Sequence, residues 1–367
     1  MQLKQIPRDA LLKPLQAVSG IVERRQTLPI LANILLEQKD GRLFVTATDL
    51  EMQITAYSEF AGKQDQSITV AARKLQDLLR ALPEDAVLNV DTAAGKMTVR
   101  AGRSRFNLQT LPAADYPRIG VAQEQLQTIS LPQRDFRGLL KLAEFAMAQQ
   151  DIRYYLNGML LVIDKGSLQA VATDGHRLSY ASLVVPGDYS RQEVILPRKT
   201  VLELGKLLED SEAEVTIDVL ANQVRFRFSN IELVSKVVDG KFPDYNRVIP
   251  SGHSKQLDLS RTELLQALQR AAILSNEKFR GVRLVLGSDQ LKIICTNSEQ
   301  EEAEEELEVG YKGEALDIGF NITYLLDVLH NLAADQVVLA LGDANSSALI
   351  TMRERNDYKY VVMPMRI

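Results

Sequence analysis

The amino-acid sequence predicts an α+β protein made of three similar domains, each with two helices packed on antiparallel sheets. Two observations predict this fold class: a helical pattern that occurs three times, and a two-strand pattern that follows each occurrence. A third, the nearly constant spacing of matching positions, indicates an internal repeat. The repeat divides the 367 residues into an N-terminal domain over 1–124, a central domain over 125–252 and a C-terminal domain over 253–367.

The first helix of each repeat has apolar residues at three- and four-residue spacing, which is typical of a helix with one buried face. The segments are "RDALLKPLQAV" from Arg8, "QRDFRGLLKLAEFA" from Gln133 and "SRTELLQALQRAAIL" from Ser260. Their paired leucines stand 128 and then 125 positions apart, at Leu11–Leu12, Leu139–Leu140 and Leu264–Leu265.

Hairpin patterns follow these helices. Alternating apolar residues surround the turn sequences "KDG", "DKG" and "GSD", and each arrangement is a strong signal for two antiparallel strands. The threonines that open "TDLE", "TDGH" and "TNSE" are 125 and then 123 positions apart, at Thr48, Thr173 and Thr296. Alternation predicts sheets with one buried face, which the helices must cover.

A second amphipathic helix comes next in each repeat, in "VAARKLQDLLRALP", "LPRKTVLELGKLLED" and "GFNITYLLDVLHNLAA", and more alternating strands follow it. The predicted order is therefore helix, strands, helix, strands, and it looks duplicated inside each repeat. Turn-rich stretches at 117–127 and 249–257 mark the domain boundaries.

Composition excludes several classes of protein. No apolar run reaches the roughly 20 residues of a membrane span, and the N-terminal stretch lacks the apolar core of a signal peptide. One cysteine excludes an internal disulfide and fits a reducing cytoplasm. A net charge of −5 argues against nucleic-acid binding by the whole surface, although a local basic face stays compatible with it.

No pattern predicts catalysis, a metal or a cofactor. Phosphate-binding loops, dinucleotide turns and nucleophile elbows do not occur, and the three histidines, His176, His253 and His330, lack ligand partners at a suitable spacing. Cys295 lies in an apolar strand pattern that favours a buried side chain. An acid–base site in "DGHR" is a weak alternative because no second positioned group accompanies it. We therefore expect a protein that is not an enzyme.

Positive charges recur near the ends of equivalent helices. Any one of them could belong to an ordinary solvated helix face, but together they favour a surface that attracts phosphates without reading bases. The loop "QQDIRYYLNG" adds an amide, a cation and two phenols that could stack on bases, or could simply pack on two faces of a strand. The basic residues are Arg24, Arg25, Arg73, Lys74, Arg80, Arg134, Arg137, Lys141, Arg198, Lys199, Lys206, Lys278 and Arg280.

All three repeats contain distinctive motifs: "TLPIL", "ATDLE", "RSRF", "LPAADYP", "RYYLNGML", "ATDGHRL", "VDGKFPDYNRV", "AILSNEKFRGVRL" and the terminal "YVVMPMRI". These motifs resemble those of bacterial DNA polymerase III beta subunits, the sliding clamps, and most closely the proteobacterial type. The resemblance implies a head-to-tail homodimer that closes six domains into a ring, with helices lining a hole for duplex DNA. It implies a processivity factor that binds DNA without sequence preference and needs a separate ATP-driven loader.

The resemblance also assigns residues to DNA contact and to dimer closure. It places Arg25, Arg73, Gln150, Tyr154 and Tyr155 on DNA. The adjacent Arg24 is the alternative to Arg25 for the same role. Ala71 stands where the family usually has proline. Unlike charges at the two ends of a protomer suit a heterologous interface, although both patches could instead be solvated strands. The implied dimer residues are Lys74, Arg103, Arg105, Phe106, Ile273, Leu274, Glu299, Glu301, Glu302, Glu304 and Glu305.

Finally, the resemblance implies a hydrophobic cleft between the central and C-terminal domains that receives short motifs of partner proteins. Those partners would be the polymerase III alpha subunit, the clamp-loader delta subunit, other DNA polymerases, and mismatch-repair or initiation-control proteins, with no membrane involved. Methionines suit such a cleft because a flexible thioether repacks around varied ligands. An accessory scaffold of the same fold is the alternative. The implied cleft residues are Leu156, Thr173, Gly175, His176, Arg177, Leu178, Pro243, Arg247, Val248, Ser347, Val361, Val362, Met363, Pro364, Met365 and Arg366, with Asn345 at the rim.

Overall fold

A computed structural model describes residues 1–22, 28–60, 65–353 and 355–367 of the chain. The described residues form two compact units. Unit 1 comprises Met1–Phe136 and Leu202–Val237, and unit 2 comprises Arg137–Val201 and Val238–Ile367. The chain passes between the units three times: inside the helices α3 (Gln133–Glu144) and α4 (Arg198–Leu207), and between Val237 and Val238.

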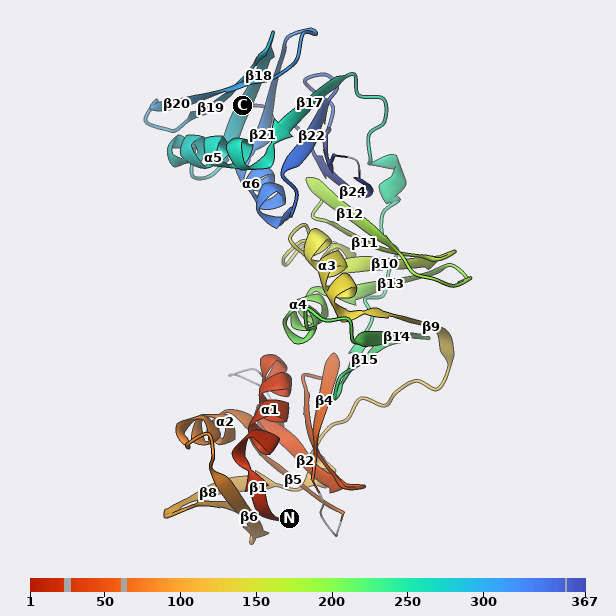
Figure 1. The fold of residues 1–367 in the computed structure, drawn as a ribbon, viewed down its shortest axis with the longest axis vertical. Coiled ribbons are helices and arrows are strands. Elements are labelled where there is room, and N and C mark those ends of the chain that lie inside the picture. Colours follow the sequence, from red (N-terminus) through yellow and green to blue (C-terminus); the bar gives the residue numbers. More distant parts are fainter. Residues whose placement is uncertain (23–27, 61–64, 354) are drawn as a thin grey trace. The chain divides into compact units, whose positions relative to one another are not determined.

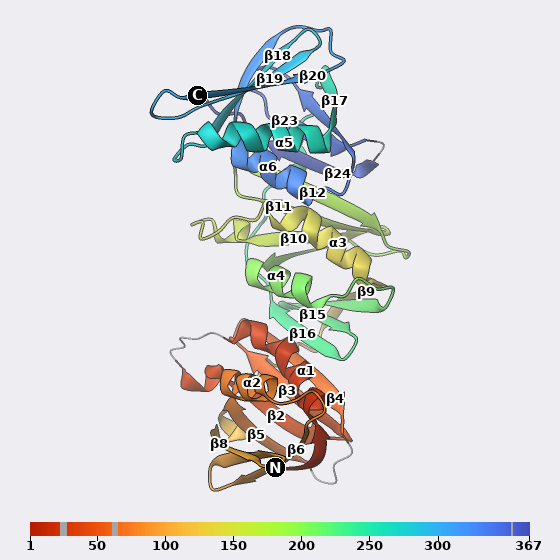
Figure 2. The ribbon, with the colours of Figure 1, turned by 60° about the vertical axis from the view of Figure 1, so that its left-hand side comes forward.

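Unit 1 contains a 12-stranded sheet in the order β1-β6-β7-β8-β5-β2-β3-β4-β16-β15-β14-β9. Helices α1 (Arg8–Val18) and α2 (Ala72–Ala81) lie side by side on one face of its N-terminal part (Figures 1 and 2). The strands are β1 (Gln2–Pro7), β2 (Asn33–Lys39), β3 (Arg42–Thr48), β4 (Met52–Glu59), β5 (Gln66–Ala71), β6 (Val87–Ala93), β7 (Lys96–Ala101), β8 (Ser104–Leu111), β9 (Gln125–Pro132), β14 (Glu214–Leu220), β15 (Gln223–Phe228) and β16 (Ile231–Lys236).

Unit 2 contains an eight-stranded sheet, β13-β10-β11-β12-β24-β23-β22-β17, and a four-stranded sheet, β20-β19-β18-β21. Helices α5 (Arg261–Ala271) and α6 (Ile322–Asn331) pack against each other in this unit (Figure 2). The strands are β10 (Gly158–Asp164), β11 (Ser167–Thr173), β12 (Arg177–Val184), β13 (Gln192–Pro197), β17 (Lys255–Ser260), β18 (Gly281–Gly287), β19 (Gln290–Thr296), β20 (Glu302–Glu308), β21 (Leu316–Asn321), β22 (Gln336–Leu341), β23 (Ala348–Met352) and β24 (Arg355–Val362).

The elements confirm the threefold repeat and correct its order. Among the described residues, each third of the chain has one strand, a helix, four strands, a second helix and three strands. The strand before the first helix, which is β1, β9 or β17, was missing from the predicted order. These strands run directly into their helices without Gly or Asn to mark a turn, and β9 and β17 begin inside the two stretches predicted to be linkers.

The predicted hairpins are present, and their backbones explain the turn sequences. Asp40 and Gly41 have φ values of 50° and 75°, and Lys165 and Gly166 have values of 42° and 78°. Two successive left-handed residues make the tight turn that matches the twist of the flanking strands. In the third hairpin Gly287 pairs with Gln290, and Asp289 has a φ of 57°.

The helices are amphipathic, as predicted, and their apolar faces build the cores. Leu11, Leu12 and Leu15 of α1 are buried, as are Leu264 and Leu268 of α5. Helix α5 begins with a capping arrangement in which the Ser260 hydroxyl accepts a hydrogen bond from the Glu263 backbone amide at 3.3 Å. No helix among the described residues is long and apolar enough to cross a membrane.

Candidate functional site

A strand seam in unit 2 joins the central third of the chain to the C-terminal third. Strand β24, the last of the chain, pairs antiparallel with β12, so that Arg177 faces Val362 and Leu178 faces Val361. The hydroxyl of Ser179 donates to the carbonyl of Leu142 on α3 at 2.6 Å, so Ser179 points toward the helices. Because strand side chains alternate, Leu178 lies on the opposite face of the sheet.

On that opposite face a hydrophobic cluster crosses the seam. It is covered by the segment after β16, whose Phe242 and Tyr245 are buried. Tyr245 stacks on Tyr180 with ring centroids 6.0 Å apart, and its hydroxyl donates to Oε1 of Gln169 at 2.9 Å. The buried members are Ala148, Leu156, Leu160, Val162, Val171, Leu178, Ile195, Phe242, Tyr245 and Val361.

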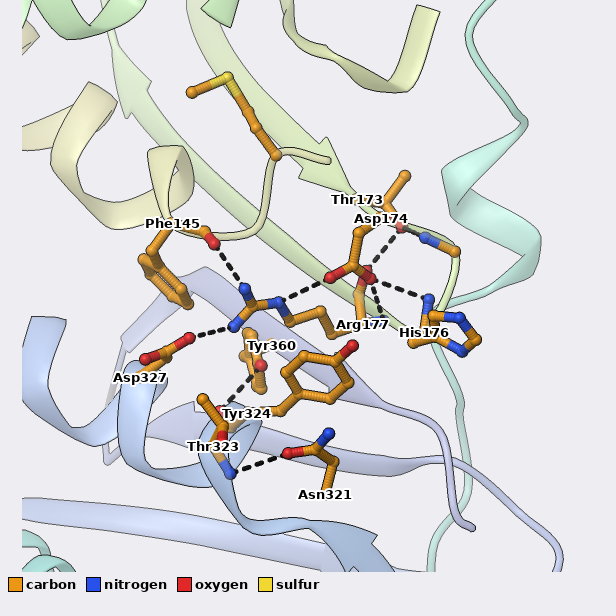
Figure 3. A network of polar contacts seen from close by, with 12 residues as sticks. Phe145, Thr173, Asp174, His176, Arg177, Asn321, Thr323, Tyr324, Asp327 and Tyr360 are labelled. Carbon is orange, nitrogen blue, oxygen red and sulfur yellow. Dashed lines mark hydrogen bonds and ion pairs between the residues drawn. The ribbon is translucent and has the colours of Figure 1, made fainter. Parts of the chain in front are cut away.

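A tight turn, Thr173–Arg177, stands at the start of β12 beside this cluster. The Thr173 hydroxyl donates to the Arg177 carbonyl at 2.6 Å and accepts from the Gly175 amide at 3.1 Å. Oδ1 of Asp174 accepts from the amides of His176 and Arg177 at 2.9 and 3.1 Å (Figure 3). Asp174 and Gly175 therefore shape the turn, and Gly175 adopts a φ of 88°.

Arg177 connects this turn to the C-terminal third. Its Nε donates to Oδ2 of Asp174 at 3.0 Å, its Nη1 to Oδ2 of Asp327 on α6 at 2.6 Å, and its Nη2 to the Phe145 carbonyl at 2.7 Å. The guanidinium also lies 4.5 Å from the ring centre of Tyr324 (Figure 3). With only 10% of its side chain exposed, Arg177 is a nearly buried charge satisfied by partners from three elements.

Two tyrosines close the far side of this network. The Tyr360 hydroxyl donates to the Tyr324 carbonyl at 2.9 Å. Burial raises the pKa of Tyr360 and of Tyr324 above the ordinary value, so both phenols stay neutral at physiological pH. The two phenols therefore add no negative charge to that of Asp174 and Asp327 around Arg177.

The loop that carries the predicted DNA-contact residues touches the same turn. Asp151 receives hydrogen bonds from the Arg153 guanidinium at 3.0 and 2.8 Å, and these bonds lower the pKa of the Asp151 carboxyl to about 2. Nη2 of Arg153 also donates to the Asp174 carbonyl at 3.3 Å. Arg153 thus links the loop that presents Gln150 and Tyr154 to the turn of the predicted cleft.

Substitution of Gly175 tests this link. An alanine Cβ there would lie 2.8 Å from Nη2 of Arg153 and would also require a left-handed backbone. Gly41 is the matched control, because its φ is similarly positive while nothing lies within 4 Å of its Cβ position. We expect Gly41→Ala to cost about 1 kcal/mol of unfolding free energy and Gly175→Ala to cost more, as measured by chemical denaturation. Equal losses would show that Arg153 does not constrain the turn.

The predicted cleft residues divide into a floor and a rim. Leu156, Thr173, Leu178, Val361 and Val362 are buried, and they support the surface without presenting much of it. The rim residues that are exposed are Gly175, His176, Pro243, Arg247, Val248, Met363 and Arg366. Ser347, Pro364 and Met365 are half-buried between these two groups, and Arg177 is nearly buried.

The corresponding seam in unit 1, between β4 and β16, is polar where the seam in unit 2 is apolar. By the spacing of the matched threonines, Gln53 takes the place of Leu178, and it faces Val234 across the seam. Oε1 of Gln53 accepts from the Ile119 amide at 3.0 Å, and Oε1 of Gln223 accepts from the Ala122 amide at 3.0 Å. Backbone amides of the connecting segment therefore occupy the first seam, which leaves the second as the candidate docking site.

The other predicted DNA-contact residues lie in different surroundings. Arg25 and its neighbour Arg24 lie outside the described residues. In unit 1, Arg73 is exposed at the start of α2 and lines a hollow of about 440 Å³. In unit 2, Gln150 is exposed, Tyr154 is 57% exposed and Tyr155 is half-buried beside it.

Several of the predicted basic positions already have partners within the chain. Arg134 pairs with Asp135 and Glu212, and Lys206 pairs with Glu203 at 2.7 Å. Nη1 of Arg198 donates to the Met147 carbonyl at 3.2 Å. The ion pairs of Arg134 and Lys206 therefore reduce the free positive charge that these positions offer to phosphates.

The predicted dimer residues are mostly at the surface. Arg103, Arg105 and Lys74 are exposed in unit 1, while Phe106 is half-buried. In unit 2, Ile273 is 78% exposed and Leu274 is half-buried, and the glutamates of β20 lie on both faces of the strand. Glu304 pairs with Lys292 at 2.6 Å and Glu305 with Arg270 at 2.5 Å, so part of the acidic patch is already neutralised.

Cys295 is buried in β19, as predicted, and burial raises the pKa of its thiol to about 11. At pH 8 almost none of the thiol is therefore the reactive thiolate. We expect the native protein to react with a thiol reagent at least about 100-fold more slowly than a free thiol, and one equivalent to react after unfolding in guanidinium. Rapid reaction of the native protein would contradict this placement.

Comparison with known proteins identifies the family. Residues 1–120, 130–244 and 246–366 match the N-terminal, central and C-terminal domains of the DNA polymerase III beta subunit. The chain belongs to the beta sliding clamps. The beta sliding clamp of Pseudomonas putida is 50% identical over 364 residues and that of Vibrio cholerae 48% identical over 363, each covering 99% of both chains.

Structural similarity to clamps is equally extensive. The crystal structure of the DNA polymerase III subunit beta from Pseudomonas aeruginosa matches with a TM-score of 0.96 and 48% identity over all of both chains. The resemblance stated from the sequence and the predicted clamp fold are confirmed. As a beta sliding clamp, the chain is the processivity subunit of a DNA polymerase III and has a non-catalytic role, which confirms that it is not an enzyme.

Proposed function

We propose that two copies of this clamp close head to tail around duplex DNA, in the cytoplasm, and tether a polymerase to it. The observation that carries this proposal is the match of three consecutive clamp domains along nearly the whole chain. The ends of these domains lie near 124 and 252 in our proposal. Closure joins Lys74, Arg103 and Arg105 of one copy to the acidic strand of the other, around Phe106, Ile273 and Leu274.

The proposed partner site is the seam of unit 2. Its floor is the buried cluster that contains Leu156, Leu178 and Val361, and its rim includes Met363 at 47% exposure and Val248 at 44%. An apolar floor with exposed flexible side chains at its edge suits short apolar peptide motifs. We propose that the polymerase III alpha subunit, the clamp-loader delta subunit and other motif-bearing replication or repair proteins dock here in turn.

The proposed DNA contacts are sequence-independent. Arg25 or its neighbour Arg24, together with Arg73, would hold phosphates, and Gln150, Tyr154 and Tyr155 would contact the duplex from the loop before β10. Such contacts neutralise phosphates without reading base edges, so affinity should fall steeply with salt. Retention of the duplex would then depend on the closed ring more than on contact strength.

Loading on circular DNA tests this function directly. The purified clamp would be loaded by a clamp loader with ATP onto nicked circular DNA, and retention would be followed by gel filtration before and after one double-strand cut. We expect the clamp to remain on circles and to leave linear molecules within minutes. The same DNA blocked at both ends after cutting should retain it. Equal loss from circles and open linear DNA would refute topological binding.

A further inference from the structure

The last five residues of the chain cross from one sheet of unit 2 to the other. The Met363 amide donates to the His176 carbonyl at 2.9 Å, which continues the pairing of β12 with β24. The Met365 amide then donates to the Gly319 carbonyl of β21 at 2.8 Å. The C-terminus lies beside β18 and β21 of the four-stranded sheet (Figure 1).

Two glycines receive this tail. Gly281 of β18 faces Asn321, and Arg283 faces Gly319 of β21, so both glycines lie on one face of the sheet, on neighbouring strands. A Cβ on Gly319 would lie 2.5 Å from the Met365 carbonyl oxygen and 2.8 Å from Cδ1 of Ile367. A Cβ on Gly281 would lie 3.1 and 3.3 Å from two carbons of the same isoleucine.

The backbone does not require glycine at either position. Neither residue has a φ in the left-handed region, and both stand within regular strands where side chains are ordinary. Glycine in a strand interior weakens the strand and often marks close approach of another backbone. Here the approaching backbone is the tail, and the missing side chains leave the space that it fills.

We propose that Gly281 and Gly319 are positioning residues for the partner cleft. Together they form a seat, a surface without side chains on which the tail packs closely, and this seat fixes the distance of the tail from the four-stranded sheet. This inference rests on the proposed partner site at the seam of unit 2. The tail is attached by two backbone hydrogen bonds and by the contact of Ile367, while Met363, Arg366 and Ile367 are largely exposed. Without this seat the tail would be mobile. Binding of a partner would then have to order the tail, and the lost conformational entropy would weaken the affinity.

The two glycines predict different responses. Gly319→Ala collides with the backbone of Met365, so we expect it to weaken peptide binding about tenfold, the effect of losing one hydrogen bond and the order of the tail. Gly281→Ala meets only the flexible side chain of Ile367, so a loss of about threefold is expected. Gly310→Ala is the control, since nothing lies within 4 Å of its Cβ position.

Truncation of Ile367 separates the two cases. Ile367→Ala removes the side chain that Gly281→Ala would strike, so the double variant should bind no worse than Ile367→Ala alone. The Met365 carbonyl remains in place, so Ile367→Ala should not rescue Gly319→Ala. Additive losses for Gly281→Ala and Ile367→Ala would overturn the inference, as would a Gly319→Ala variant that binds like the unaltered protein.

The assay uses full-length protein and a fluorescein-labelled clamp-binding segment of a polymerase III alpha subunit, with affinity read from fluorescence anisotropy. Light scattering should show the same dimer for every variant, because the seat acts on the cleft and not on ring closure. If Gly319→Ala fails to fold, the inference is tested by comparing the peptide affinities of Gly281→Ala, Ile367→Ala and the double variant. If the unaltered protein forms the dimer but does not bind the peptide, the proposed partner site itself is wrong.

Discussion

Arg177→Met is expected to lower the thermal unfolding midpoint of the clamp by roughly 10 °C, because it removes one partner from a buried ionic network and leaves the others unsatisfied. Asp174, Asp327 and the Phe145 carbonyl would each lose a hydrogen bond of 3.0 Å or less. Breaking such a network costs about 3–5 kcal/mol. Differential scanning calorimetry of the full-length protein would measure the shift.

Arg191 provides a matched control on the surface of the same unit. It also bridges two carboxylates, Asp164 at 3.1 Å and Glu193 at 2.5 Å, but half of its side chain is exposed. Solvent screening reduces the value of such pairs to about 0–1 kcal/mol, so Arg191→Met should change the midpoint by no more than a few degrees. Similar shifts for the two variants would mean that Arg177 does not hold the seam together.

Removal of Met363–Ile367 is expected to reduce the affinity for an alpha-subunit peptide by about 100-fold or more, because the cleft loses a wall that carries most of its adaptable surface. The floor should survive, since Tyr358 and Tyr360 of β24 are fully buried and hold that strand in its sheet. Fluorescence anisotropy would measure the affinity, and light scattering would measure the dimer.

Two further observations make that experiment decisive. Removal of Ile367 alone should weaken peptide binding much less, because both backbone hydrogen bonds of the tail remain. Calorimetry of the truncated clamp should give an unfolding midpoint close to that of the full chain. If dimerisation and peptide binding disappear together, the tail is part of the fold and the assignment of a partner-binding wall is incorrect.

The sequence revealed the fold because its signals are local and repeated. Amphipathic helices and Gly-containing turns recur at nearly constant spacing, and spacing survives even where individual residues differ. The strands β1, β9 and β17 escaped detection because each merges with its helix without a turn residue. Their presence can be deduced only once neighbouring strands are known to need partners.

The network at the seam could not be predicted in the same way. Asp327 and Arg177 are 150 positions apart, and no spacing rule connects an aspartate on a helix to an arginine at the start of a strand. A signal was present in hindsight: Asp327 interrupts the apolar run "YLLDVL", where a charge requires a partner. Likewise, the positive charges of Arg134 and Lys206 were visible in the sequence. The glutamates that pair with them could be identified only from the structure.

The two seams also determine whether one third of the chain can fold without the others. Strand β16 completes its sheet by pairing with β4, and β12 completes its sheet by pairing with β24, so the central third finds a partner strand in each neighbour. Expressed alone, that third would expose two bare strand edges, which invite association with other chains. The three repeats share one order of elements, but the middle repeat depends on a strand from each neighbour and is therefore not an independent building block.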